Sequence, residues 1–188
     1  CWTSDSDRTP LEPLTRSLTR STETPEGTPG AEESVLESLS ASYQSLFGHT
    51  ARGAICPYET EYGEDTLFQK PQEMADIAGF MRAFGLVPDP ASRERIDHIS
   101  CELEFVAFLA RKEAHAIEPR DEPMREATAG ATRLFLRDRL ARFVPSLARQ
   151  VVRESPAGFH GRLSELLSAL VRAGCRRLGV SMGPEMLR

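Results

Sequence analysis

The chain has 188 residues, of which 40% are hydrophobic and 27% are charged. These values are typical of a soluble globular protein of about one domain. The net charge of −5 argues against a generic nucleic-acid binder, and the chain contains no apolar run long enough for a membrane span. The charge is distributed unevenly: residues 56–104 carry 11 acidic and 4 basic side chains, whereas residues 120–188 carry 13 basic and 7 acidic ones. Any function has to account for this acidic middle and basic end.

The first 31 residues are rich in Ser, Thr, Pro, Glu and Gly. Such a composition cannot bury enough apolar surface to offset the entropy lost on ordering, so residues 1–31 are predicted to be a flexible N-terminal tail. The four cysteines of the chain show no C-x-x-C spacing. Reduced thiols in a cytoplasmic protein are the simplest interpretation of that pattern.

From Glu32 onward, apolar residues recur at helical spacing. A first helix is expected to end at Gly48, and a long loop, residues 49–70, follows it. Pro71 suits the first position of a second helix, which Gly85 closes. Asp97 is a candidate N-cap for a third helix.

The C-terminal part of the chain predicts further helices. Pro123 opens one that Pro145 is expected to break, a short helix then runs to about Arg153, and a last helix extends from Phe159 to Leu178. No convincing alternating strand pattern occurs. The sequence therefore predicts an all-α, single-domain helical bundle of about six or seven helices over residues 32–188.

The usual signatures of nucleotide-binding and hydrolytic enzymes are absent from the chain. One alternative is a small helical metal-binding protein or enzyme, in which His98, Cys101 and Glu102 lie on neighbouring turns and Cys56 adds a ligand from the loop. Zinc sites usually draw paired ligands from two turns or strands, however, so a surface histidine and a core cysteine also explain the pattern.

The loop is unusually acidic and carries two tyrosines, with the residues Tyr58, Glu59, Glu61, Tyr62, Glu64 and Asp65. Three interpretations are open. The carboxylates could perform acid–base chemistry, the loop could be merely solvated, or it could form a recognition surface for a basic, partly apolar ligand.

Two stretches carry a resemblance to a known family: "CPYETEYGEDTLFQKPQEMADIAGFMRAFGL" and "RIDHISCELEFVAFLARKEA". Together they resemble the TorD/DmsD/NarJ type of cytoplasmic chaperone for molybdenum enzymes, and in particular its delta-subunit branch, which serves the dimethyl-sulfoxide-reductase superfamily. The similarity covers roughly residues 43–145. The combination of the Tyr-Glu-Thr-Glu-Tyr-Gly loop with an Asp-His pair before Glu-Leu-Glu-Phe is specific.

The resemblance implies an all-helical protein without catalysis of its own. Its expected partner is the cofactor-free catalytic subunit of a molybdenum oxidoreductase, bound at the twin-arginine leader and held back from export until the molybdenum cofactor is inserted. In the family, a short acid-Pro-x-Asp-His segment is tied to leader binding. Here that segment reads Glu94-Arg95-Ile96-Asp97-His98, with Arg95 where proline is common.

A twin-arginine leader combines two guanidinium groups with an apolar stretch, so its binder needs carboxylates and an apolar groove. The predicted peptide-binding residues are therefore Tyr58, Glu59, Glu61, Tyr62, Glu94, Asp97, His98 and Glu102. Asp97 could serve as ligand contact, N-cap or both. No catalytic residue, cofactor or metal is predicted, and the chain is expected to be a monomer or a homodimer.

Overall fold

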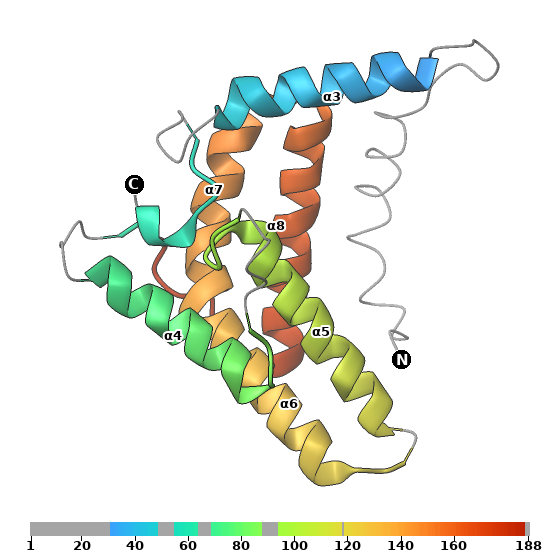
Figure 1. Ribbon diagram of the computed structural model, residues 1–188, viewed down its shortest axis with the longest axis vertical. Coiled ribbons are helices and arrows are strands. Elements are labelled where there is room, and N and C mark those ends of the chain that lie inside the picture. Colours follow the sequence, from blue (N-terminus) through green and yellow to red (C-terminus); the bar gives the residue numbers. More distant parts are fainter. Residues whose placement is uncertain (1–30, 49–54, 64–68, 88–93, 118, 187–188) are drawn as a thin grey trace. The chain divides into compact units, whose positions relative to one another are not determined.

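The computed structural model describes residues 31–48, 55–63, 69–87, 94–117 and 119–186. Within these ranges the helices are α3 (Ala31–Phe47), α4 (Gln69–Ala83), α5 (Ile99–Ile117), α6 (Glu122–Phe135), α7 (Ala141–Glu154) and α8 (Phe159–Leu178) (Figure 1). The described ranges hold no strand, only an isolated bridge between Tyr58 and His98. The all-α prediction is therefore confirmed. The predicted tail lies outside the described residues, apart from Ala31.

Two short turns complete the described elements, the 3-10 turn η1 (Glu59–Glu61) and the π-helical turn η2 (Leu136–Leu140). Because α6, η2 and α7 follow one another without a break (Figure 1), the six described α-helices form five continuous rods. Counted separately, the six described α-helices agree with the expected six or seven. None of the described helices combines the length and apolarity needed to cross a bilayer.

The chain divides into two compact units. The first unit comprises Cys1–Cys56 and Val144–Ala173, and the second comprises Pro57–Phe143 and Gly174–Arg188. In the first unit, the hydroxyl of Ser42 in α3 lies 3.0 Å from Nδ1 of His160 in α8. The rings of Tyr43 and Phe47 also pack on this histidine, at centroid distances of 6.0 and 6.2 Å.

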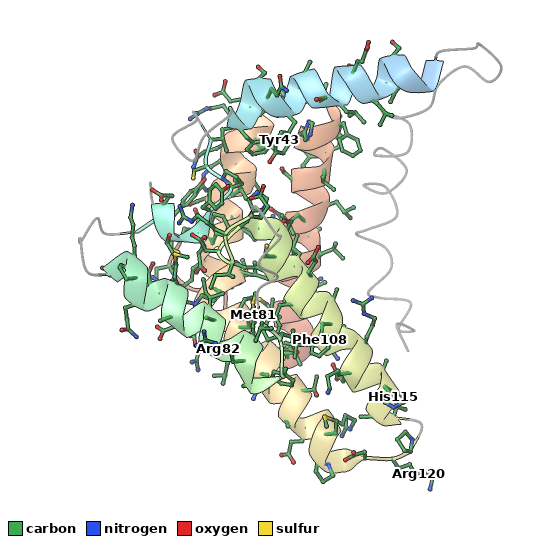
Figure 2. The ribbon with its side chains drawn as sticks, viewed as in Figure 1. Tyr43, Met81, Arg82, Phe108, His115 and Arg120 are labelled. Carbon is green, nitrogen blue, oxygen red and sulfur yellow. The ribbon has the colours of Figure 1, made fainter. Side chains whose placement is uncertain are left out.

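An aromatic cluster forms the core of the second unit. Phe135, at the end of α6, packs edge to face on Phe80 of α4 and Phe105 of α5, with centroid distances of 5.5 and 5.0 Å. Phe84, just after α4, contacts both Phe105 and Phe108 in the same way. Side chains fill the region around α4 and α5, where Met81 and Phe108 are marked in Figure 2. Helices α5 and α6 pack against each other (Figure 1), and the contact between Phe105 and Phe135 is part of that packing.

The end of α8 and the residues after it make polar contacts within the second unit. Nε of Arg133 donates to the carbonyl of Leu178 over 2.8 Å, and the backbone N–H of Met186 donates to the carbonyl of Arg142 over 3.0 Å. The guanidinium of Arg177 binds both carboxylate oxygens of Glu113, at 3.1 and 2.9 Å. The C-terminal stretch is therefore part of this unit's packing.

Both predicted glycine stops are confirmed. Gly48 and Gly85 have φ of 69° and 75°, in the left-handed region that glycine adopts at low cost. The N–H of Gly48 donates to the carbonyl of Gln44, and the N–H of Gly85 donates to that of Arg82. These bonds satisfy carbonyl groups that the ends of α3 and α4 would otherwise leave free.

Of the three predictions from prolines, that from Pro123, which lies in the first turn of α6, is confirmed, and those from Pro71 and Pro145 were wrong in detail. Helix α4 begins at Gln69, so Pro71 is its third residue, where the missing N–H costs nothing because first-turn amides have no helical partner. Pro145 lies inside α7 and does not break it. The π-helical turn η2 directly precedes α7, and such turns accommodate a shifted hydrogen-bond pattern. Burial of the neighbouring Phe143, Val144 and Leu147 favours keeping this segment helical.

Candidate functional site

The loop after Cys56 and the turn before α5 are joined by backbone hydrogen bonds. The N–H of Glu59 donates to the carbonyl of Asp97 over 2.8 Å, and the N–H of Ile99 donates to that of Pro57 over 2.9 Å. These bonds flank the bridge between Tyr58 and His98. Two acidic segments that are far apart in the sequence thereby meet within the second unit.

Asp97 is the buried centre of this junction. Its side chain is fully buried, and Oδ2 accepts a hydrogen bond of 2.7 Å from the hydroxyl of Thr60. Arg95 binds the same carboxylate with two bonds, from Nε to Oδ1 at 3.0 Å and from Nη2 to Oδ2 at 2.7 Å. A charge buried at this depth is stable only when it is paired in this way.

The guanidinium of Arg95 has further partners around it. Nη2 donates to the Thr60 hydroxyl at 2.8 Å, Nη1 lies 3.3 Å from Oε1 of Glu61, and the group sits 4.6 Å from the centroid of the Tyr58 ring. We call Tyr58, Thr60, Glu61 and Asp97 the guanidinium cradle. Burial lowers the pKa of Arg95, but the hydrogen bonds and charges of Asp97 and Glu61 outweigh burial and raise that pKa above its usual value.

Two residues of the cradle, Tyr58 and Glu61, also bind polar groups outside it. The hydroxyl of Tyr58 donates to Oε2 of Glu94 over 3.1 Å, and Lys70 lies 2.9 Å from Oε2 of Glu61. Burial alone would raise the pKa of Glu61, but the hydrogen bonds from Lys70 and Arg95 hold it below its usual value. Glu94 is exposed, and Tyr58 and Glu61 are half-buried. We call Tyr58, Glu61 and Glu94 the acidic rim.

Beneath the cradle lies a second set of acids, the buried acid pair Glu59 and Glu102. Both side chains are fully buried. Nη1 of Arg139, itself nearly buried, lies 3.5 Å from Oε1 of Glu59, and its Nη2 lies 3.6 Å from Oδ2 of Asp76. Burial raises the pKa of Glu59 against the opposing charge of Arg139, and burial together with the charge of Glu59 raises the pKa of Glu102 well above the ordinary range. Burial and the neighbouring carboxylate therefore both disfavour the charged form of Glu102.

His98, and not Asp97, caps α5, which corrects the expectation from the sequence. Nδ1 of His98 accepts a hydrogen bond from the backbone N–H of Ser100 over 3.2 Å, as an N-cap side chain does, and it lies 2.7 Å from the Ser100 hydroxyl. Burial lowers the pKa of His98, although the charges of Glu94 and Asp97 act in the opposite direction. A neutral imidazole also fits the acceptor role of Nδ1.

The structure offers no support for the metal alternative. Burial raises the pKa of the Cys101 thiol. Across the part of the chain that the structure describes, no three His, Cys, Asp or Glu side chains are grouped so as to hold a metal ion.

The eight predicted peptide-binding residues separate by depth. The acidic rim reaches the surface, whereas Glu59, Tyr62, Asp97, His98 and Glu102 are buried. The ring of Tyr62 packs on Phe143 at 4.9 Å. Glu64 and Asp65 lie outside the described residues. The buried members support the rim from within, and their role in peptide binding stays a prediction.

Sequence reasoning missed three residues of the site, namely Thr60, Arg95 and Arg139. Arg95 was noted only as a departure from the resemblance. The signal that was available is its position two residues before Asp97, in a segment with an excess of acids. The pairing of Arg139 with Glu59 has no local signal, because 80 residues separate the two.

Comparison with known proteins places this site in a family. The family model described as nitrate reductase delta subunit matches residues 4–149, which include both segments of the site. The chaperone protein TorD of Photobacterium profundum is 31% identical over 140 residues, covering 73% of this chain and 62% of that protein. The perchlorate reductase assembly chaperone protein of Dechloromonas aromatica is 32% identical over 104 residues, covering 55% and 46%. The chaperone protein TorD of Salmonella newport is 24% identical over 135 residues, covering 71% and 57%.

The chain thus spans about half to three-fifths of the length of these relatives. No solved structure matches it significantly. The relatives are named as chaperones or assembly proteins and not as catalysts, in agreement with the expectation that the chain has no catalysis of its own. Since the family model matches well over half of the sequence, the chain belongs to the nitrate reductase delta subunit family, the family of the TorD-type chaperones.

Proposed function

We propose that this chain is a maturation chaperone for a molybdenum oxidoreductase. It binds the cofactor-free catalytic subunit at its twin-arginine leader, on the cytoplasmic side, and delays export until the cofactor is inserted. Family membership supports the chaperone role. The leader and the molybdenum-containing client are the parts of the proposal that experiment has to establish.

The observation that carries the proposal is the position of the acidic rim. Tyr58 and Glu61 come from the loop and Glu94 from the turn before α5. The two backbone hydrogen bonds between these segments, one of which joins Glu59 to Asp97, hold them together. Carboxylates beside a tyrosine ring suit the planar, fork-shaped guanidinium groups of a leader. The acidic middle of the chain, net −7 over residues 56–104, also attracts a cationic peptide.

Isothermal titration calorimetry with a synthetic twin-arginine leader tests the proposal. The same peptide with both arginines replaced by lysine should bind more weakly, because lysine cannot make bidentate bonds to a carboxylate. The double variant Glu61→Gln/Glu94→Gln should weaken binding of the arginine peptide by roughly tenfold, since exposed ion pairs contribute up to about 1 kcal/mol each.

A matched control is the double variant Glu104→Gln/Glu126→Gln. It removes the same charge from exposed positions on α5 and α6 that are not part of the rim. Equal loss of affinity in both double variants would show that only net charge matters. Absence of binding to the arginine peptide by the unmodified chain would refute the leader as the ligand.

Recovery of the partner from cells addresses the client. The chain, tagged and expressed in its native host, should co-purify with a molybdenum-enzyme catalytic subunit that still carries its leader. Mass spectrometry of the captured protein identifies it, and capture should decrease with the Glu61→Gln/Glu94→Gln variant. Consistent recovery of an unrelated partner in place of such a subunit would contradict the proposal.

A further inference from the structure

Arg95 makes with its own chain the contacts that a protein uses to bind an arginine from another molecule. Two parallel hydrogen bonds join its guanidinium to the Asp97 carboxylate, at 3.0 and 2.7 Å. Glu61 adds an ion pair of 3.3 Å, and the Tyr58 ring lies under the group at 4.6 Å. A bidentate carboxylate, a second acid and an aromatic face together are selective for guanidinium over ammonium.

The guanidinium cradle is held in place by bonds that do not involve Arg95. Thr60 donates to Asp97 through its hydroxyl, and the backbone of Glu59 donates to the carbonyl of Asp97. The Tyr58 hydroxyl is bonded to Glu94, and its ring packs edge to face on His98 at 5.1 Å. Lys70 holds Glu61. These contacts do not depend on Arg95, and without it the buried Asp97 carboxylate keeps its Thr60 bonds but lacks a cation, which an external arginine can supply.

The cradle also reaches solvent. The side chain of Arg95 is 35% exposed, whereas that of Asp97 beneath it is fully buried. The site thus has a buried carboxylate at its base, an acidic rim at its mouth, and an arginine that enters from the exposed side. An arginine from outside the chain could approach along the same side.

We propose that the cradle is an arginine-binding subsite, and that Arg95 occupies it as an internal substitute until an arginine of the bound peptide displaces it. This inference rests in part on the proposed function, because it assigns the cradle to one arginine of the leader. Any time that Arg95 spends in the site lowers the apparent affinity for an external arginine by the corresponding factor. Removal of Arg95 should therefore strengthen binding of a guanidinium ligand.

The first experiment uses a small probe and no leader. Ethylguanidinium is titrated into the Arg95→Ala variant, at millimolar concentrations well below those that denature proteins, and amide shifts of residues 58–61 and 94–98 are followed by NMR. The variant should bind ethylguanidinium saturably and ethylammonium much more weakly, and the unmodified chain should bind ethylguanidinium about tenfold more weakly than the variant does. A folded Arg95→Ala variant that fails to bind ethylguanidinium would overturn the proposal.

Three further variants make this result specific. Arg82→Ala removes the same charge from an exposed position on α4, marked in Figure 2, and should not strengthen probe binding. Adding Asp97→Asn to Arg95→Ala should abolish probe binding, since the base of the cradle is lost. If Arg95→Ala does not fold, Arg95→Gln keeps much of the side-chain length and takes its place in the same titration.

The second experiment measures the leader peptide with the same proteins. Arg95→Ala should bind it about tenfold more tightly than the unmodified chain, the factor that corresponds to a site filled by Arg95 about nine-tenths of the time. Probe binding without leader binding in any form would leave the subsite intact and refute the proposed function. Leader binding that is unchanged or weakened by Arg95→Ala would refute the displacement of Arg95 and leave the proposed function standing.

Discussion

The hydroxyl of Thr60 donates to the carboxylate of Asp97 over 2.7 Å, and the backbone N–H of Thr60 lies 3.4 Å from the same oxygen. Both side chains are buried, and 37 residues of sequence separate them. Because Arg95 donates to both partners, this pair connects the loop, the turn before α5 and the guanidinium cradle. The integrity of the site should therefore depend on one hydroxyl group.

Replacing Thr60 with valine tests this dependence. Valine keeps the shape of threonine but removes the hydroxyl, so the buried carboxylate of Asp97 loses a partner. We expect the free energy of unfolding to decrease by about 1–3 kcal/mol in urea titrations. Thr60→Ser keeps the hydroxyl and should lose less. Equal stability of the valine and serine variants would show that the hydrogen bond contributes little.

The buried acid pair should make stability depend on pH in a definite direction. The pKa of Glu102 is raised in the folded chain by burial and by Glu59, so the folded state keeps a proton that the unfolded state releases above its ordinary pKa of 4.5. Stability is therefore fully present below that pH and is lost as pH rises toward the folded-state pKa. The loss amounts to roughly 1 kcal/mol for each pH unit in that window.

Replacing Glu102 with glutamine removes this penalty, because the amide is neutral at every pH in this range. The stability of Glu102→Gln relative to the unmodified chain should increase between pH 5 and pH 8, as measured by urea unfolding at each pH. Glu104→Gln, an exposed change on the same helix, controls for the loss of charge. A difference that is constant with pH, or that decreases with it, would contradict the raised pKa of Glu102.

His98 should make the stability of the fold depend on pH in the opposite direction to Glu102. Burial lowers its folded-state pKa below the usual 6.5, so the unfolded state takes up a proton first as pH falls. The contribution of neutral His98 is present above that pH and is lost as pH decreases toward the folded-state pKa. His98→Asn keeps a capping acceptor without the titration, so the unmodified chain should lose more stability than this variant between pH 7 and pH 5.5.

The capping role of His98 is separable from its titration. His98→Ala removes the acceptor for the N–H of Ser100 and should cost about 1 kcal/mol relative to His98→Asn at pH 8. Helix content from circular dichroism and urea midpoints together measure the effect. If alanine and asparagine are equivalent at pH 8, the ring nitrogen does not stabilise the start of α5.

Local patterns in the sequence were sufficient for the helices and not for the site. The ends of α3 and α4 follow from Gly48 and Gly85, because a left-handed glycine has a local cause. The predicted helix break at Pro145 was wrong, because burial of the surrounding residues outweighs the local preference of proline for ending a helix.

At the site, the sequence indicated an acidic surface but not which of its acidic residues are buried and which are exposed. Glu61 and Glu59 are two residues apart, yet one is half-buried at the rim and the other is fully buried. That difference depends on contacts with Arg95 and Arg139, which are distant in sequence. For the same reason, the sequence predicted Asp97 as the cap of α5. Its carboxylate instead binds Thr60 and Arg95, contacts that the local sequence pattern does not reveal.

Arg139 should be the most costly of these residues to remove. It is almost fully buried in η2 and forms an ion pair with Glu59, which has no exposed surface. Arg139→Met keeps the apolar stem and leaves the buried acid pair without its cation. Breaking a buried pair on one side costs about 3–5 kcal/mol, and we expect a loss of that order in urea unfolding at pH 8.

The double variant Arg139→Met/Glu59→Gln separates loss of the cation from loss of packing. If the cost arises from the uncompensated carboxylate, the added Glu59→Gln change should recover much of the lost stability. The cost of Arg139→Met alone should also be smaller at pH 5 than at pH 8, because Glu59 binds a proton more readily at the lower pH. Arg137→Met, in the same turn but half exposed and paired with Asp138, should change stability by less than about 1 kcal/mol. No recovery in the double variant would mean that Arg139 stabilises the unit through packing and not by neutralising Glu59.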